Sequence, residues 1–520
     1  MKKRLVMIFF LLLAVTRVPA RDEDIWAASL EKVSDIVTIL KSNYYKNLDS
    51  EKLAYASIRG MLDTLDPHSY FLDPENFPRV REDYSGKFYG LGIQIQKQED
   101  RLVVISAIES TPAWRLGIQP GDIIATINGE STKPLTSFEA LQRLRGEKGT
   151  KVTITILRDG LEKPLELTIT REEIPLHSVP YSFMLNEATG YIYIRNFAET
   201  TTEEFEEKIV GLAKQGMRSL ILDLRGNTGG PLVQSIEISD MFLPKGARVV
   251  SIRGRNKGYD RDFSAFKDGQ YEKLPLVILI NQGTASASEI VSGAVMDHDR
   301  GLVVGEDSWG KGLVQNLFPL GQNTAVAITT AKYLTPSGRS IQRDYSHIDD
   351  YYLNKQVPEE NREIKYTDKG RKVLGQGGIS PDYAVETVLK PVVAEILIRG
   401  AFFGYARKFT RHQTELGQKF IFPEEPLPAV TAASGKILIG DSFVVNAEVI
   451  ADFKAYLKTL KMDVDLQKFE EAREDVRREL EREIYGSLWG IDAGVKIYRE
   501  SDPVVAKALA VMPEAAKMVE

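Results

Sequence analysis

The 520-residue chain has no cysteine and only five histidines, and each shortage excludes a class of chemistry. Without cysteine there are no disulfides, thiolate metal sites, iron–sulfur clusters or cysteine nucleophiles. No pair of histidines has the H-x-x-x-H spacing of zinc hydrolases. The five are His68, His177, His298, His347 and His412. The sequence therefore predicts no metal and no cofactor, and its chemistry must rest on Ser, Thr, Lys, Asp or Glu.

An excess of positive charge is also missing. The chain has 67 Lys and Arg against 73 Asp and Glu, a net charge of −6, which argues against nucleic acid as a partner. With 43% apolar residues it is long enough for several cores. At about 100–200 residues per domain, the length predicts roughly three to four domains.

The N-terminus carries a hydrophobic run that is too short for a membrane span. Residues 5–15 are largely apolar, follow Met1-Lys2-Lys3-Arg4, and precede Val18-Pro19-Ala20. As a helix this run is about 16 Å long, roughly half of a hydrocarbon core. We therefore predict a signal peptide at 1–20 and export, most simply to a bacterial periplasm. An uncleaved N-terminal anchor is the alternative.

Along the rest of the chain the pattern of predicted secondary structure changes three times, which predicts a multidomain α/β protein. A helical pattern gives way to short alternating strands with Gly and Asn turns. Strands then alternate with helices, and a final helical part follows a proline-rich stretch. The predicted parts are the N-terminal helical region 21–85, a β-rich domain at 86–174, an α/β core at 175–390 and a helical C-terminal extension at 391–520. The dense Glu and Arg of the extension predict a solvated helix face, with partner binding as the alternative.

One segment with possible chemistry follows the apolar strand predicted at Leu276–Ile280. Ser286-x-x-Glu289 has the pattern of a capping box at the start of a helix. A serine at that place also has unpaired backbone N–H groups beside it, including that of Ala287, and these suit an oxyanion. Both interpretations remain open on spacing alone.

A second segment, residues 305–312, follows the next apolar strand. It resembles the phosphate-binding P-loop, but Gly312 stands where the hydroxyl that binds the metal is needed. Lys311, between Gly310 and Gly312, is either structural or a general base. A base role requires the lysine pKa to fall from about 10.4 to roughly 7–8, which burial between closely packed glycines can provide.

A third segment, residues 223–230, ends in Gly229 and Gly230. Paired glycines are ordinary turn residues. They can equally point backbone N–H groups at an anion.

Together these segments resemble the C-terminal processing peptidases, or tail-specific proteases, a serine peptidase family that uses a Ser–Lys dyad. The resemblance covers about residues 30–385. Its motifs are Leu65-Asp66-Pro67-His68-Ser69, Tyr89-Gly90-Leu91-Gly92-Ile93, Pro120-Gly121-Asp122, Asp223-Leu224-Arg225-Gly226-Asn227, Ser286-Ala287-Ser288-Glu289, Gly310-Lys311-Gly312, Tyr333-Leu334-Thr335-Pro336 and Gly378-Ile379-Ser380-Pro381-Asp382.

The resemblance implies a crotonase- or ClpP-like α/β protease core and assigns the catalytic positions. Ser286 matches the nucleophile, and Lys311, twenty-five residues later, matches the general base. Gln315 matches the residue that orients the lysine. Ser288 is the near rival for the nucleophile, and the spacing to Lys311 favours Ser286.

The resemblance also implies supporting positions. The oxyanion hole would be formed by the backbone of Ala287, Gly229 and Gly230, and Asp297 would have a supporting role. The family usually has proline where this chain has Thr228.

The β-rich domain at 86–174 resembles PDZ domains, which bind a peptide as an added strand and hold its terminal carboxylate with backbone N–H groups. The matching carboxylate loop is Gly90, Leu91, Gly92 and Ile93. Arg145 matches a residue that couples the PDZ domain to the protease.

These features predict an exported serine endopeptidase that recognises protein C-terminal tails. Its partners would be protein or peptide substrates with free C-termini. An adaptor protein or self-association through the C-terminal extension is a further possibility. The alternative function is a catalytically silent, PDZ-bearing scaffold that holds C-termini, and the intact dyad positions speak against it.

Overall fold

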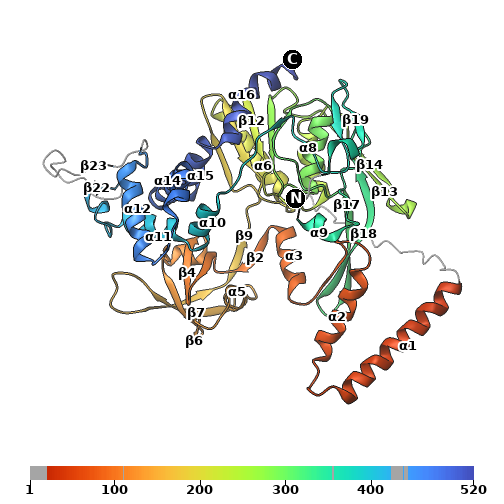
Figure 1. Cartoon of the computed structure of the whole chain (residues 1–520), viewed down its shortest axis with the longest axis horizontal. Coiled ribbons are helices and arrows are strands. Elements are labelled where there is room, and N and C mark those ends of the chain that lie inside the picture. The colour runs from red at the N-terminus through yellow and green to blue at the C-terminus, as the bar shows by residue number, and fades with distance from the viewer. Residues whose placement is uncertain (1–19, 109, 354–356, 423–436, 439–442) are drawn as a thin grey trace, which may run out of the picture.

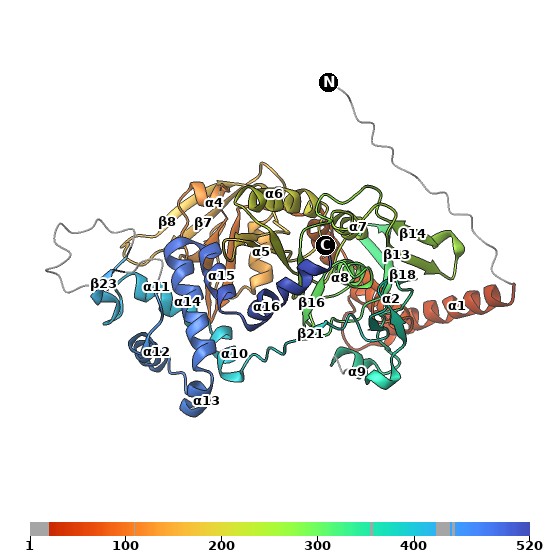
Figure 2. The same ribbon diagram turned by 90° about the horizontal axis from the view of Figure 1, so that it is seen from above.

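The computed structural model describes residues 20–108, 110–353, 357–422, 437–438 and 443–520. A central α/β core contacts the β-rich domain and the N-terminal helices, and the C-terminal helices lie beside the core and the β-rich domain (Figures 1 and 2). The predicted signal peptide lies outside the described residues except for Ala20. Within the described ranges, no helix combines the length and apolarity that crossing a membrane requires.

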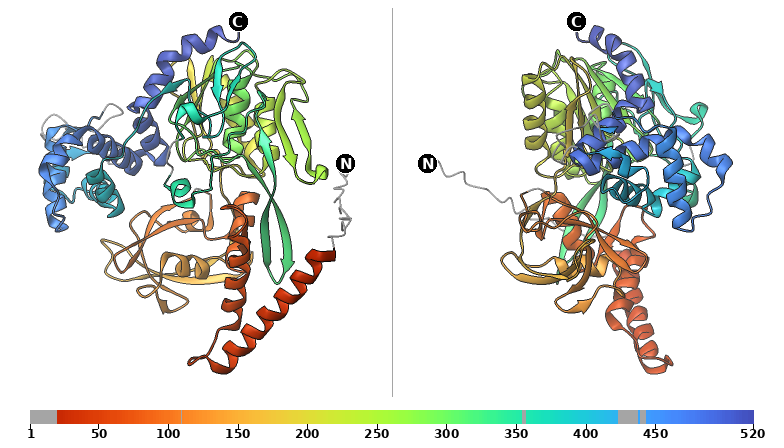
Figure 3. Two further views of the ribbon diagram at one scale, coloured as in Figure 1. Left: turned by 45° about the vertical axis from the view of Figure 1, so that its right-hand side comes forward. Right: turned by 90° about the vertical axis from the view of Figure 1, so that its left-hand side faces the viewer.

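The N-terminal region contains the predicted helices. Helices α1 (Ala20–Asn43) and α2 (Ser50–Leu62) form an arm that extends from the body, as Figure 3 shows. The carboxylate of Asp49 caps α2 by accepting the N–H of Lys52 at 3.0 Å. After the predicted turn, β1 (Tyr70–Leu72) pairs antiparallel with β18 (Thr324–Leu334), and helix α3 (Asn76–Ser85) follows. The pairing of β1 joins this region to the core.

The β-rich domain has a sheet with the strand order β3-β4-β5-β7-β8, with β6 beside β5 and a separate β2–β9 pair. Its strands are β2 (Lys87–Gly90), β3 (Ile93–Gln98), β4 (Arg101–Ala107), β5 (Ile123–Ile127), β6 (Glu130–Ser131), β7 (Lys151–Leu157), β8 (Leu165–Thr170) and β9 (Glu172–Pro175). Its helices are α4 (Pro112–Arg115) and α5 (Ser137–Leu144). The alternation of buried and exposed side chains along β7 is the pattern from which the sequence predicts a strand.

The α/β core has a central sheet with the strand order β10-β11-β12-β15-β16-β21, parallel from β11 onward. Its strands are β10 (Tyr181–Met184), β11 (Thr189–Tyr193), β12 (Ser219–Asp223), β15 (Leu276–Ile280), β16 (Leu302–Gly305) and β21 (Tyr383–Ala384). Helices α6 (Thr201–Lys214), α7 (Leu232–Asp240) and α8 (Ala287–Asp297) connect its strands. Because the carboxyl ends of parallel strands lie at one edge, the loops after β12, β15 and β16 come together there.

A second sheet packs beside the first, with the order β1-β18-β13-β14 and β17 paired to β18. Its remaining strands are β13 (Arg248–Gly254), β14 (Arg261–Ser264) and β17 (Leu313–Gly321). Short elements complete the core: η1 (Lys257–Tyr259), α9 (Ile348–Tyr352), η2 (Glu359–Asn361), β19 (Ile364–Tyr366) and β20 (Lys372–Leu374). The position of β17 places Gln315 beside the loop that carries Lys311.

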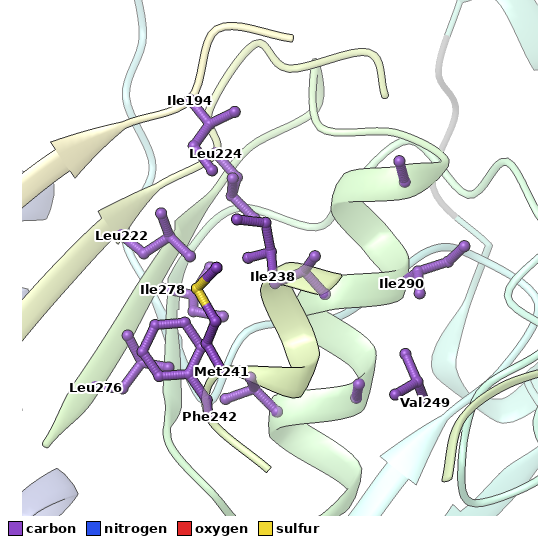
Figure 4. Packing of buried hydrophobic residues seen from close by; sticks show 14 of the residues in the cluster. Ile194, Leu222, Leu224, Ile238, Met241, Phe242, Val249, Leu276, Ile278 and Ile290 are labelled. Atoms are coloured by element: carbon purple, nitrogen blue, oxygen red, sulfur yellow. The ribbon is translucent and has the colours of Figure 1, made fainter. Parts of the chain in front are cut away.

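The central sheet is buried on both faces, as its near-continuous apolar strands predict. Side chains of one parity along β11, β12 and β15 face helices α6, α7 and α8. Figure 4 shows this layer, in which Leu222 and Ile278 from the sheet lie near Ile238 of α7. Side chains of the other parity, including Ile221 and Leu279, pack against α16 (Pro503–Lys517).

The C-terminal helices span from the β-rich domain to the core. They are α10 (Pro391–Ile398), α11 (Ala401–Thr410), α12 (Ala447–Thr459), α13 (Leu466–Glu471), α14 (Arg473–Trp489), α15 (Ile491–Glu500) and α16; η3 (Gly417–Lys419), β22 (Phe420–Ile421) and β23 (Ile437–Leu438) lie between α11 and α12. On α11, Arg407 donates to the carbonyl of Gly121 at 3.2 Å and forms an ion pair with Asp159 at 3.4 Å. The charged face of α14 forms ion pairs along its own helix, for example Arg477 with Glu481.

The division at residue 390 that the sequence suggests does not follow the packing. Helix α16 lies beyond that boundary, yet it covers one face of the core sheet, where Val504 and Ala508 are buried against the strands. Helices α10 to α14 instead have their own apolar cluster. The difference arises because the pattern of residue types along the sequence does not show which surface a terminal helix covers.

Candidate active site

Ser286 stands at the junction between the loop after β15 and the start of α8. Its backbone has φ +57° and ψ −114°, a conformation that non-glycine residues rarely adopt. Its N–H donates to Oε2 of Glu289 at 2.8 Å, which is one of the bonds of the predicted capping box. The structure therefore holds Ser286 in a strained but anchored backbone, as is common at functional sites.

The loop of residues 225–230, called the glycine loop, follows β12 and lies directly against Ser286. A Cβ on Gly229 would lie 2.8 Å from the Cβ of Ser286, and a Cβ on Gly230 would collide with the backbone oxygen of Phe197. Both glycines have positive φ, at +97° and +153°. Side chains are thus excluded at both positions, and the loop backbone approaches the serine closely.

The N–H groups of the two glycines have different partners. The N–H of Gly229 donates to Oδ1 of Asn227 at 2.9 Å, so it is already used within the loop. The N–H groups of Gly230 and Ala287 meet no acceptor among the residues that the structure describes. Of the three donors suggested by the sequence, Gly230 and Ala287 are available for an oxyanion, whereas Gly229 provides the close approach.

Lys311 lies in the loop after β16, between two tightly packed glycines. A Cβ on Gly310 would lie 2.9 Å from the N of Gly378, and one on Gly312 would lie 3.0 Å from the N of Gln342. Burial lowers the pKa of the Lys311 amine, because desolvation penalises the charged form, while the carboxylates of Glu289 and Asp66 oppose the change. The direction is the one that a general base requires.

A single cavity of about 680 Å³ brings most of the predicted protease residues together. Those that line it are Ser286, Ala287, Gly229, Gly230, Lys311 and Gln315. Apolar side chains form much of the remaining wall: Val80, Leu176, Phe197, Leu232, Ile290, Leu313 and Val314. A serine hydroxyl, a partly buried amine and residues with two free N–H donors therefore line one cavity, whose wall also includes the charged Asp83 and Arg195, an arrangement suited to acyl transfer.

Glu289 joins the two loops that carry Ser286 and Lys311. Its carboxylate is fully buried and accepts the N–H groups of both residues, at 2.8 Å and 2.9 Å. It also accepts the Gly310 N–H at 2.7 Å and the Ser308 hydroxyl at 2.5 Å. Burial raises the pKa of Glu289, and these four donors oppose that rise by stabilising the carboxylate. The sequence pattern identifies Glu289 as a cap but gives no sign of the bonds to residues 308–311.

Gln315 is connected to the N-terminal region by two hydrogen bonds. Its Nε2 donates to Oγ1 of Thr329 at 3.2 Å, and that hydroxyl donates to Oδ1 of Asp66 at 3.0 Å. Asp66 belongs to the turn between α2 and β1, which the sequence marks as part of the family resemblance. The turn thus helps to orient a side chain of the cavity.

His68, from the same turn, lies close enough to Lys311 for the two charges to interact. Burial and the nearby lysine lower the pKa of His68 to about 4, and its Nε2 bonds the hydroxyl of Tyr351 at 2.6 Å. The imidazole is therefore neutral near pH 7. Sequence reasoning does not place this histidine near the site.

Asp297 lies at the opposite end of α8 and does not line the cavity. Its carboxylate accepts Nη2 of Arg339 at 2.7 Å, the hydroxyl of Thr335 at 2.5 Å and the N–H of Ser337 at 3.0 Å. Neither Asp297 nor Arg339 has an exposed side chain. Any support from Asp297 therefore acts through the packing of residues 335–339.

The β-rich domain offers an open edge beside its predicted carboxylate loop. Strand β3 is at the edge of its sheet, and α5 packs against it. The carbonyl oxygens of Leu91 and Gly92 accept the N–H groups of Ala113 and Ile108. The N–H groups of Leu91 and Gly92 themselves meet no acceptor within the described part of the chain. This arrangement suits a peptide added along β3 with its carboxylate at the loop.

Arg145 connects this domain to the cavity wall. It caps the C-terminal end of α5, forms an ion pair with Glu82 of α3 at 2.5 Å and lies over the ring of Phe88 at 4.6 Å. Helix α3 also supplies Val80 and Tyr84 to the cavity. Arg145 therefore contacts an element that forms part of the candidate active site.

Family models match three segments of the chain. A model described as peptidase family S41 matches residues 188–350, and one described as a PDZ domain matches residues 90–169. A third, described as the activating protease CtpB N-terminal domain, matches residues 15–76. The fold and the matched segments define the class: a serine-type peptidase core preceded by a PDZ domain, which supports peptide binding.

Similar proteins of known class indicate the family within these peptidases. The chain is 39% identical over 317 residues to the carboxy-terminal-processing protease of Bartonella bacilliformis, covering 60% of this chain and 72% of that protein. It is 36% identical over 317 residues to carboxy-terminal processing protease CtpA of Bacillus subtilis, covering 61% and 67%. Among solved structures, the photosystem II D1 C-terminal processing protease is 27% identical, with a TM-score of 0.37 and coverage of 69% and 89%.

The chain belongs to the carboxy-terminal processing protease family of S41 peptidases. The family resemblance and the multidomain α/β fold with a PDZ domain, both predicted from the sequence, are confirmed.

Proposed function

We propose that the chain is an exported serine endopeptidase that binds protein C-terminal tails through its PDZ domain and hydrolyses peptide bonds with a Ser286–Lys311 dyad. One observation carries the proposal: Ser286, Lys311 and Gln315 line the same cavity as the free N–H groups of Gly230 and Ala287. Intact positions of this kind make the scaffold alternative the weaker one.

The reaction would begin with Lys311 in its neutral form. Its Nζ accepts the proton of Ser286 as Oγ attacks the scissile carbonyl carbon, and the carbonyl oxygen becomes an oxyanion held by the N–H groups of Gly230 and Ala287. Collapse of this intermediate breaks the C–N bond, and Lys311 returns the proton to the leaving amine. Lys311 then deprotonates a water molecule that attacks the acyl carbon; the ester bond to Oγ of Ser286 breaks, and Lys311 returns the proton to Oγ, which frees the acid product.

The lowered pKa of Lys311 favours this scheme, because the neutral fraction of the amine at a given pH increases as the pKa falls. An amine with an ordinary pKa of 10.5 would be protonated and unable to accept the serine proton. Desolvation in the cavity favours the neutral amine. The negative charge of Glu289 opposes this lowering of the pKa. The same carboxylate accepts the backbone N–H groups of Ser286 and Lys311 and so fixes the position of both residues.

Substrate capture would use the edge of the PDZ sheet. A C-terminal segment adds along β3, the free N–H groups of Leu91 and Gly92 bind its carboxylate, and the contact between Arg145 and Glu82 passes the binding event to α3. The apolar part of the cavity wall suits apolar side chains next to the scissile bond.

The test of the dyad is cleavage of an unfolded protein with a free C-terminus by the wild type, Ser286→Ala and Lys311→Ala. We expect turnover with the wild type and only background rates with both variants. Ser288→Ala is the matched control, because it removes a hydroxyl two residues away. Equal rates in all of them would discard the dyad, and tight binding of tail peptides without turnover in any of them would favour the scaffold.

Export to the periplasm remains part of the proposal and rests on residues 1–20. Sequencing the mature N-terminus of protein purified from the periplasmic fraction tests it. We expect a start near Arg21. An intact Met1 in the membrane fraction would instead establish the anchored alternative.

A further inference from the structure

The glycine loop is tied at its first residue to the C-terminal helix of the chain. The guanidinium of Arg225 contacts two carboxylates: Oδ2 of Asp223 at 2.6 Å and Oδ2 of Asp502 at 2.8 Å. Asp223 ends strand β12, whereas Asp502 stands directly before α16. In Figure 1, α16 runs beside β12, so two segments far apart in the sequence meet at this point.

The two carboxylate oxygens of Asp502 do different work. Oδ1 accepts the N–H of Val504 at 2.9 Å and so caps α16, while Oδ2 accepts from Arg225 and from Arg499, the latter at 3.0 Å. One side chain thus fixes the start of the helix and holds the guanidinium of the glycine loop. The two tasks can be separated by substitution.

Three of the four charged side chains in the cluster are almost closed to solvent, the fourth, Arg499, is 21% exposed, and the charges balance. The exposed side-chain fraction is 0% for Asp223, 6% for Asp502 and 10% for Arg225. Arg499 is the second cation, and the hydroxyl of Tyr191 donates to Asp223 at 2.6 Å. Loss of the Asp502 charge would leave two arginines facing one carboxylate in a nearly dry site, and such an excess charge moves toward water when it can.

Movement of Arg225 would reach the oxyanion donor. Arg225 begins the loop that ends at Gly230, a residue that lines the cavity and has a free N–H. The middle of the loop has its own anchors, since Gly226 donates to the side chain of Asn281 and the carbonyl of Asn227 accepts from Ala285. These anchors limit the displacement, so we expect reduced catalysis and a folded protein. Small misplacements of a catalytic group are nevertheless costly.

We propose that Asp502 is a positioning residue that holds the oxyanion donor of the glycine loop through Arg225. Helix α16 is then part of the catalytic apparatus, although it lies outside the segment that matches the S41 family model. The inference rests on the proposed function, because it assigns a role in the same reaction.

The test is Asp502→Asn in the full chain. Asparagine keeps an oxygen that can cap α16. It has no negative charge, however, and it turns an NH₂ group toward the guanidinium of Arg225. We expect kcat to fall about tenfold with KM within about twofold, because oxyanion donors act more strongly on the transition state than on the bound substrate. Asp502→Glu, which keeps the charge, should recover most of the loss.

Glu514→Gln is the matched control. It removes a carboxylate from the same helix, where Glu514 accepts the hydroxyl of Tyr383 at 2.5 Å at an exposed position. Its kcat should equal that of the wild type. Rates are divided by the concentration of enzyme that a fluorophosphonate labels at Ser286, so that unfolded protein does not count.

A kcat for Asp502→Asn within twofold of the wild type would overturn the inference, as would a rise in KM alone. If that variant does not fold, Arg225→Lys takes its place. Nη2 of Arg225 contacts both carboxylates while Nε holds Asp223, and lysine keeps the charge but cannot make both sets of bonds. The same expectation and the same contradiction apply. Failure of the proposed function would give a different result. Either the wild type would be inactive, or Ser286→Ala would cleave the substrate as fast as the wild type.

Discussion

The two ends of helix α8 carry acidic residues that look equally important in the sequence and do different work. At the N-terminal end, Glu289 accepts four hydrogen bonds and joins the loops that carry Ser286 and Lys311. At the C-terminal end, Asp297 pairs with Arg339 and lies outside the cavity. Burial is almost complete at both ends, so the partners decide the function of each carboxylate.

The comparison separates activity from stability. In the proposed mechanism, the bonds of Glu289 to the backbones of Ser286 and Lys311 position the reacting groups, so the loss of these bonds should lower kcat. A buried ion pair between a helix end and a turn fixes the fold, and its loss should appear in the free energy of unfolding. Four substitutions test this division, from the largest expected effect to the smallest.

Lys311→Arg should reduce kcat/KM by about 10²–10⁴-fold, because arginine keeps the positive charge but cannot be deprotonated to act as a base. For the wild type we expect kcat/KM to rise with pH through the folded pKa of Lys311, which lies below its ordinary value of 10.5. The folded state then binds fewer protons than the unfolded state between these two pKa values, so this group makes stability rise with pH across that interval. Rates measured from pH 5 to 10, with an unfolding curve for each protein, check both statements. Wild-type activity in Lys311→Arg would show that Lys311 is not the general base.

Asp297→Asn should lower the free energy of unfolding by about 3–5 kcal/mol, because it leaves Arg339 buried without its carboxylate. We expect kcat per labelled active site to change less than about threefold. Denaturant unfolding and active-site labelling provide the two measurements. The double variant Asp297→Asn with Arg339→Met should regain part of the lost stability. A large drop in kcat with normal stability would move Asp297 into the catalytic group and break the comparison.

Glu289→Gln should give the reverse pattern. The amide offers one accepting oxygen where the carboxylate offers two, so donors around the loops of Ser286 and Lys311 lose their acceptor, at a cost of about 1–3 kcal/mol. We expect kcat to fall about tenfold or more, with KM changed less. Steady-state kinetics on the same unfolded substrate check this. Unchanged kcat in a variant that is merely less stable would show that the two ends of α8 do the same kind of work.

Apolar runs and glycine turns mark the strands that precede the three loops of the site, so the sequence predicts these strands and loops. The second sheet, with β13, β14, β17 and β18, is not predicted. The family spacing also selected Ser286 and Lys311, which do line one cavity. In parallel sheets, loops after neighbouring strands meet at one edge, so this part of the site follows from local pattern and topology.

Other features depend on contacts that no local pattern contains. The N–H of Gly229 is taken by the side chain of Asn227, which only the folded loop reveals. The sequence identifies Glu289 only as a helix cap. Its bonds to residues 308–311 join the loops after two neighbouring strands, and no local pattern indicates them. The docking of α16 on the sheet depends on which face the other helices leave open.

The smallest effect is expected from Ser288→Ala, which tests the division within the N-terminal end of α8. Ser288 is fully buried, and its hydroxyl donates to the carbonyl of Asn227 at 3.1 Å. That carbonyl also accepts the N–H of Ala285, so the loss of one donor leaves it satisfied, and we expect a cost of about 1 kcal/mol or less in stability. Activity should stay within about threefold of the wild type, in contrast to Ser286→Ala. If instead Ser288→Ala were inactive and Ser286→Ala active, the nucleophile would be the buried serine, and the strained backbone at Ser286 would need another explanation.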